Sequence, residues 1–195
     1  MQRFEDVFGK YIEKNCYNAP LRESEVVGLQ IATEDNAIRV ALSSPCIIPY
    51  SAIAEAQRIL SMNLSARSVA ISARYPSELL GPEAFSLVID YLKAANVPVN
   101  GFFRRAEIMY DNRCFTVRLP EQTVTFLEPL ALPGKIAAQA EALFGIRPQV
   151  SFIPVPDYEL KPIDPRPTVV DDYIPEIPPI PEEAPPWEDA TPLSK

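Results

Sequence analysis

In the first 76 residues, some segments show the three- and four-residue spacing of apolar side chains typical of helices, and others show the alternation typical of strands. Spacings of three and four over residues 4–15 predict an amphipathic helix, and alternation over 26–32 and 38–42 predicts two strands. The polar segment between these strands favours a hairpin turn. A helix that begins at Pro49 and an alternating strand over 68–74 follow. The first unit is therefore predicted as α-β-β-α-β.

A second unit is predicted after the connection at 75–82, where two prolines and a glycine indicate a boundary or a sharp turn. Pro82 starts an amphipathic helix that ends before the Asn-Val-Pro stop at 96–98. The next residues carry no clear pattern. Apolar and aromatic residues over 108–110 and 114–119 then predict a second hairpin.

Two helical stretches, over 121–127 and 135–144, continue the second unit, and Gly145 is the expected C-terminal cap of the later one. A last strand is predicted over 150–153. The order α-β-β-α-α-β is that of a type II KH domain. We therefore expect an α+β fold with two small α/β units, the second KH-like. The expected domains are residues 1–76, 77–154 and a disordered tail over 155–195.

Composition sets this tail apart from the rest of the chain. Ten of the 22 prolines lie in residues 1–153 and twelve in the last 42 residues. Charge divides at the same place, because residues 1–153 hold 15 basic and 16 acidic side chains, whereas the last 42 hold 3 and 10. Frequent proline favours extended polyproline II and disfavours a packed helix or strand. The tail is therefore predicted as a disordered, acidic, proline-rich linker.

Several kinds of chemistry are excluded by the residue types. The chain has no His, so it cannot by itself form a Ser-His-Asp or Cys-His pair or a His-ligated zinc site. No glycine-rich phosphate loop is present. The candidate carboxylate pairs Asp171-Asp172 and Glu188-Asp189 lie in the tail, and Glu34-Asp35 lies in a hairpin turn. We therefore predict no catalytic, cofactor-binding or metal-binding residue and no small-molecule substrate. The three cysteines are too far apart for a C-x-x-C pair: Cys16, Cys46 and Cys114.

The expected location is the cytoplasm. The charged N-terminus lacks the apolar core of a signal peptide, and no apolar run approaches the ~18 residues of a membrane span. No membrane partner is expected.

One basic and aromatic cluster in the second hairpin is a candidate contact surface for single-stranded nucleic acid, which binds through cationic and stacking side chains. In the alternative interpretation, the aromatic rings face the core and the arginines only solvate the outer face. Neighbouring acidic residues reduce the positive charge of this region. The candidate residues are Arg104, Arg105, Arg113, Arg118, Phe103 and Phe115.

KH domains clamp nucleic acid with a G-x-x-G loop between their two consecutive helices. The corresponding link here, residues 127–135, contains the single glycine Gly134. This segment favours a KH-like fold without the nucleic-acid clamp.

The layout resembles the N-terminal region of the PolC-type DNA polymerase III alpha subunit. The resemblance covers about residues 1–155 and is carried by FEDVF at 4–8, VGLQI at 27–31, IRVAL at 38–42 and IPY at 48–50, followed by the KH-like unit and the acidic linker. It depends on the order of elements and on the hydrophobic pattern, without a catalytic signature.

This resemblance implies a non-catalytic part of a DNA-directed DNA polymerase. In that family the OB, PHP, exonuclease and polymerase domains come after such a region, and the chain is expected to be a fragment or a split gene product. The KH-like part is similar to interaction domains of the initiator DnaA and of the clamp-loader tau subunit. The implied partners are replisome proteins and the remainder of the polymerase, and the implied process is DNA replication.

Two functional hypotheses follow. The first is a non-catalytic module that docks a replicative polymerase to replisome proteins. The second is a KH-like module that binds single-stranded nucleic acid, at least weakly, through the basic and aromatic hairpin.

Overall fold

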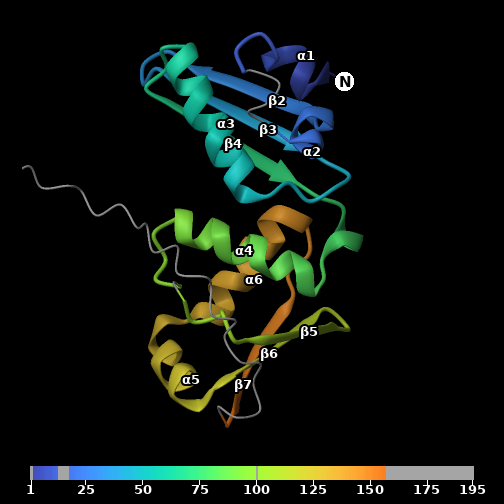
Figure 1. Cartoon of the computed structure of the whole chain (residues 1–195), viewed down its shortest axis with the longest axis vertical. Helices are drawn as coiled ribbons and strands as arrows, with labels where there is room; N and C mark the ends of the chain where they lie inside the picture. The colour runs from blue at the N-terminus through green and yellow to red at the C-terminus, as the bar shows by residue number, and fades with distance from the viewer. Residues whose placement is uncertain (1, 13–17, 100, 157–195) are drawn as a thin grey trace, which may run out of the picture. The chain divides into compact units, whose positions relative to one another are not determined.

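The computed structural model describes residues 2–12, 18–99 and 101–156 of the chain. They form a mixed α+β fold with two small sheets and several helices, as predicted (Figure 1). Both sheets belong to one compact unit. The predicted division at residue 76 stays a prediction. The predicted disorder of the tail concerns residues that, from 157 onward, lie outside the described part.

The first sheet has the strand order β1-β2-β3-β4. Strand β1 (Gln2–Arg3) pairs antiparallel with β2 (Glu25–Ala32), which forms an antiparallel hairpin with β3 (Ala37–Ser43). Strand β4 (Ser68–Arg74) returns parallel to β3. The predicted hairpin and the predicted strand over 68–74 are confirmed. The two-residue strand β1 was not predicted, because it is too short to show a period.

The predicted first helix is wrong in length. Helix α1 (Phe4–Phe8) ends before Gly9, and the N–H of Tyr11 donates to the carbonyl of Phe8 in a tighter turn. Ile12 is nevertheless buried. The apolar spacing therefore indicates that the side chains of this turn are buried, and it does not indicate that the helix continues.

A second short helix, α2 (Ala19–Glu23), was missed. Its N-cap is Asn18, whose side-chain oxygen accepts the N–H of Leu21 at 3.1 Å, and Pro20 lies in its first turn. Asn followed by Pro at these positions is a helix-start signal that the search for apolar periodicity overlooks.

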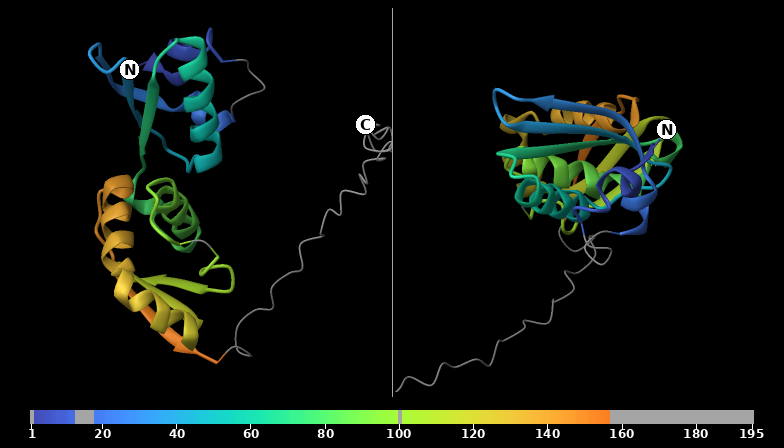
Figure 2. Two further views of the ribbon diagram at one scale, coloured as in Figure 1. Left: turned by 90° about the vertical axis from the view of Figure 1, so that its left-hand side faces the viewer. Right: turned by 90° about the horizontal axis from the view of Figure 1, so that it is seen from above.

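Helix α3 (Tyr50–Asn63) connects β3 to β4 and packs on one face of the first sheet (Figures 1 and 2). Ile53, Ala56 and Leu60 are fully buried on its inner side. Alternate residues of β3 and β4 are buried on one face of the sheet. Among them are Val40 and Ile71, which are register partners. Burial of these apolar side chains is the main stabilising term for the first half of the unit.

The connection after β4 contains the 3-10 turn η2 (Ser77–Leu79) and leads to α4 (Pro82–Ala94), which begins at proline as predicted. Tyr75 joins the two halves: its N–H donates to the carbonyl of Leu143 at 2.8 Å, and its ring lies 5.4 Å from that of Phe144. Its hydroxyl donates to the carbonyl of Ile48 at 3.4 Å.

The second sheet has the order β5-β6-β7. Strands β5 (Glu107–Asp111) and β6 (Cys114–Pro120) form the predicted hairpin, and β7 (Gln149–Val155) pairs parallel with β6. Strand β7 runs two residues beyond the predicted end at 153, through Pro154. Because β7 is an edge strand, a residue without an N–H is tolerated there.

Three helical segments lie between β6 and β7: α5 (Glu121–Leu127), the 3-10 turn η3 (Glu128–Leu130) and α6 (Leu132–Phe144). The two predicted helices are confirmed, although α6 begins three residues earlier than predicted. Gly145 ends α6 with φ 71°, the left-handed conformation expected of a glycine cap. Within the described residues, no helix is both long and apolar enough to cross a membrane.

Candidate interaction surfaces

The two phenylalanines proposed for base stacking are core residues of the second half. Phe115, on β6, is 0% exposed, and its ring lies 5.4 Å from Phe85 and 4.6 Å from Tyr110. Phe103 is half-buried, 5.4 Å from Phe85 and 6.0 Å from Phe152. In this conformation neither face of Phe115 is open to a nucleotide base. The rings follow the alternative interpretation, in which the aromatics of the hairpin pack inward.

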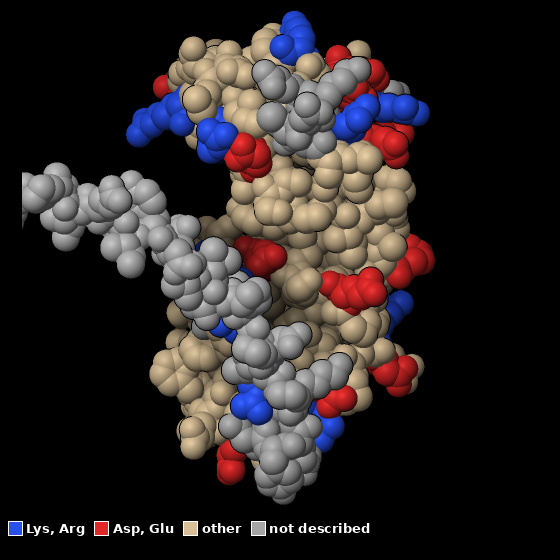
Figure 3. Space-filling model, viewed as in Figure 1, with Lys and Arg blue, Asp and Glu red and all other residues tan. Residues whose placement is uncertain are grey.

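The four arginines of this region differ in their exposure. Arg118 is half-buried and forms an ion pair with Glu107 at 2.7 Å across the hairpin. Arg105 is also half-buried, whereas Arg104 and Arg113 are exposed. Arg113 has φ 61°, the left-handed conformation of a tight hairpin turn, where it follows Asn112. On the face shown in Figure 3, basic and acidic side chains are interspersed.

The link between α5 and α6 is a packed turn. Leu127 and Leu132, at its two ends, are 0% exposed. Between them, η3 is followed by Ala131 with φ 49°, and Gly134 lies in the first turn of α6. Side chains anchor this link at both ends, whereas a glycine clamp offers free backbone N–H groups to phosphates.

Beside this link the surface has an apolar hollow of about 410 Å³. We call it the α5–α6 hollow. Phe126, on α5, is 60% exposed, and its ring lies 5.2 Å from that of Phe102. Phe126 does not line the hollow, because it is two residues from both Val124 and Glu128 and therefore lies on another side of α5. The residues that line the hollow are Val124, Glu128, Ala131, Pro133, Gly134 and Phe152.

Sequence reasoning did not find the α5–α6 hollow. Its walls come from α5, η3, α6 and β7, so no local pattern contains it. Helix α5 buries only Leu127 completely, so its apolar spacing gives no signal for the hollow.

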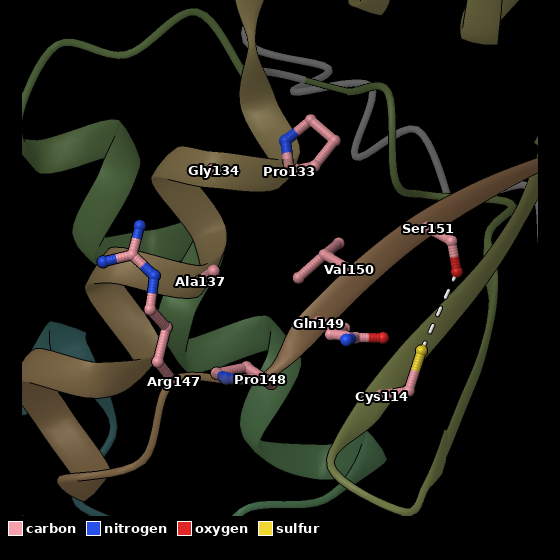
Figure 4. Close-up of a pocket in the computed structure, with 9 residues that line it drawn as sticks. All are labelled: Cys114, Pro133, Gly134, Ala137, Arg147, Pro148, Gln149, Val150 and Ser151. Carbon is pink, nitrogen blue, oxygen red and sulfur yellow. Dashed lines mark hydrogen bonds between the residues drawn. The ribbon is translucent and has the colours of Figure 1, made fainter.

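A second hollow, of about 400 Å³, lies between the start of α6 and the start of β7 (Figure 4). In it the Cys114 sulfur lies 3.9 Å from the Ser151 hydroxyl, and Arg147 forms an ion pair with Glu141 at 3.1 Å. The chain has no imidazole that could activate this thiol. Within the described ranges, no group of three or more Cys, Asp and Glu side chains is placed to hold a metal ion.

Among the described residues, the buried Tyr75 and the half-buried Tyr91 have clearly raised pKa values. Burial raises the pKa of Tyr75 to about 12, against an ordinary value of 10. Burial, with the nearby tyrosines Tyr75 and Tyr50, also raises the pKa of Tyr91. The Tyr91 hydroxyl is buried without a hydrogen-bond partner among the described residues. Both rings pack against other aromatic side chains: Tyr75 against Phe144 and Tyr91 against Tyr50.

Neither a comparison with models of known protein families nor a search of curated proteins finds a match to this sequence.

Proposed function

We propose that this chain is a non-catalytic interaction module of a PolC-type DNA polymerase III, which docks to replisome proteins during DNA replication. Two observations carry the proposal: the apolar α5–α6 hollow and, on another side of α5, the exposed Phe126. Exposed aromatic side chains and well-packed apolar pockets are both typical of protein-binding surfaces. The chemistry of this surface fits an apolar side chain of a protein partner better than a phosphate backbone.

We further propose that the second half is KH-like and lacks the clamp. The order α4-β5-β6-α5-α6-β7 supports the type II arrangement. The packed link between Leu127 and Leu132 supports a KH-like unit adapted to protein partners, because it leaves no glycine loop for the phosphate backbone.

Direct binding to purified replisome proteins tests the docking proposal. The full chain is passed over immobilised clamp loader, sliding clamp, helicase and single-strand-binding protein by surface plasmon resonance. We expect one of them to bind, and Phe126→Ser to weaken that binding at least about tenfold, as loss of an interface aromatic does. Met62→Ser is the matched control, since Met62 is 67% exposed on α3 in the other half. Absence of binding to every component, or equal loss in both variants, contradicts the proposal.

A second function, binding of single-stranded nucleic acid, is favoured by the exposure of Arg104 and Arg113. Fluorescence anisotropy with a labelled single-stranded DNA tests it. If these side chains neutralise phosphates, affinity falls steeply with salt, and Arg104→Ala and Arg113→Ala each reduce the salt slope by about one unit. Under the docking proposal, the full chain shows no such salt-dependent affinity and both variants behave like the parent.

A further inference from the structure

The outer edge of β2 is bare over most of its length. Strand β1 pairs with β2 only at Val26 and Glu25, and no other described strand lies along residues 27–32 on that side. An uncovered strand edge presents unpaired backbone N–H and C=O groups, which favour pairing with another strand.

The side chains of this edge do nothing to prevent such pairing. Residues 27–32 contain no charge and no proline. Val27, Leu29 and Ile31 are 51%, 48% and 67% exposed. Natural edges usually carry a charge, a proline or a bulge. A register shift between Val26 and Gly28 interrupts only the start of this edge, which leaves residues 28–32 regular.

The two exposed side chains of the regular part lie on one face of the sheet. Leu29 is the register partner of Val40, and Ile31 is the register partner of Ile38. Residues directly opposite in antiparallel strands share a face, so both lie on the face that buries Val40. Gln30, next to Arg39, lies on the other face. The edge therefore has one apolar face and one uncharged polar face.

We propose that a second copy of this chain occupies this edge through antiparallel pairing of β2 with β2, centred on Gln30. In that register, Gln30 lies opposite the partner's Gln30, Leu29 opposite the partner's Ile31, and Gly28 opposite the partner's Ala32. All five regular edge residues find partners, and β4-β3-β2 of the two copies form one continuous sheet.

The edge is complementary to itself on both faces, which favours a second copy over a foreign strand. A twofold axis at Gln30 places apolar residues opposite apolar residues and amide opposite amide, the arrangement a closed dimer requires. Within residues 28–32, no charge faces a like charge across the pairing. The chain's own tail is a poor occupant, because residues 154–195 hold twelve prolines and a proline cannot donate to a ladder.

At the ends of the edge, this register brings charges of both signs to the same level. The hairpin turn of each copy, with Glu34 and Asp35, reaches the level at which β1 of the other copy pairs with Val26 and Glu25. Arg3 of β1 lies at that level beside Glu25. Because Glu25 of one copy also lies opposite Asp35 of the other, charge at the ends does not favour the dimer, and the pairing depends on residues 28–32.

Sedimentation velocity of the full chain, over about a hundredfold range of concentration, tests the proposal, since dimerisation depends on concentration. We expect a monomer–dimer equilibrium, and Ile31→Lys should raise its dissociation constant at least about tenfold because a charge blocks the apolar edge. The matched control is Met109→Lys, an exposed residue on the edge strand of the other hairpin, which should leave the dimer intact. Circular dichroism checks that each variant is folded. A chain that stays monomeric, or a dimer insensitive to Ile31→Lys, overturns the proposal.

A disulfide trap tests the register without depending on a destabilising charge. With the three native cysteines replaced by serine, Gln30→Cys should form a covalent dimer on mild oxidation. Opposite residues in antiparallel strands are about 4.5–5.5 Å apart at Cα, within the reach of a disulfide. Arg39→Cys is the control, because three strand spacings of about 4.8 Å then separate the two thiols. Equal cross-linking of both variants, or none with Gln30→Cys, contradicts the register. The Phe126 surface is not involved, so failure here leaves the docking proposal standing.

Discussion

The two halves of the described chain repeat one topology with different edges. In each half an antiparallel hairpin is followed by a helical connection and a strand parallel to the second hairpin strand. The first half uses the single helix α3 for this connection, whereas the second uses α5, η3 and α6. The same strand arrangement is therefore compatible with different numbers of connecting helices.

The outer hairpin strands differ most. Strand β5 exposes Glu107, Met109 and Asp111, and Glu107 is held by Arg118 at 2.7 Å. Strand β2 exposes Leu29 and Ile31 without a neighbouring charge. Charged edges discourage strand pairing and apolar edges favour it. The two edges have the same place in the topology, so the exposed side chains determine which of them favours a partner.

The largest effect should come from opening the core of the second half. Phe115→Ala removes a fully buried ring and is expected to lower the free energy of unfolding by about 3–5 kcal/mol. Leu42→Ala, in the core of the first half, should cost about 2–5 kcal/mol. Urea unfolding followed by circular dichroism measures both.

The same pair of variants shows whether the halves unfold together. Because Tyr75 joins the halves through Leu143 and Phe144, we expect a single transition that moves with either substitution. Two transitions, each sensitive to only one variant, would contradict this coupling. Phe126→Ala is the control, as its ring is 60% exposed and should cost less than about 1 kcal/mol.

Alkaline pH should weaken the junction between the halves. Because the pKa of Tyr75 is raised to about 12 in the folded state, its contribution to stability is fully present below pH 10 and is lost as pH rises from 10 through 12. The unfolded state ionises first and is favoured in that window. Tyr75→Phe should reduce the alkaline decrease in the free energy of unfolding by on the order of 1–2 kcal/mol.

Thermal unfolding of parent and variant at several pH values between 9 and about 12 measures this difference. Tyr91 should add to the alkaline loss in the same direction, since burial raises the pKa of its hydroxyl as well. A Tyr75→Phe variant with the same pH dependence as the parent would show that the buried phenol is not responsible.

The periodic parts of this fold could be predicted from sequence and the irregular parts could not. Strand β4 and both hairpins were found because alternation identifies strands whatever surrounds them. Helix α1 was predicted too long, since Tyr11 and Ile12 continue the helical spacing although the chain turns at Gly9. Alternation also shows that Phe115 and Arg118 lie on opposite faces, but not which face is covered. The α5–α6 hollow depends on contacts among four elements and has no local signature.

The hairpin turns offer a smaller test. Arg113 adopts φ 61°, which a residue with a side chain reaches only at some cost, whereas glycine reaches it freely. Arg113→Gly is therefore expected to stabilise the protein by about 0.5–1 kcal/mol, because Asn-Gly suits a two-residue turn of this kind. Arg113→Ala, which keeps the strain and removes the charge, is the control in thermal unfolding. If the glycine variant is no more stable than the alanine variant, the turn is not strained.

The smallest effect should come from the ion pair across the second hairpin. The Glu107 and Arg118 side chains are 45% and 30% exposed, so water screens their attraction and Glu107→Gln should lower the free energy of unfolding by less than about 1 kcal/mol.

Self-association through the β5 edge should change more than the free energy of unfolding does. Replacing Glu107 and Asp111 together by Ile would give β5 an uncharged edge like that of β2, and sedimentation velocity should then show new self-association through the second hairpin. If this double variant sediments like the parent, edge charge is not what distinguishes β5 from β2. The helical covers α3 and α5–α6 would then have to account for the difference.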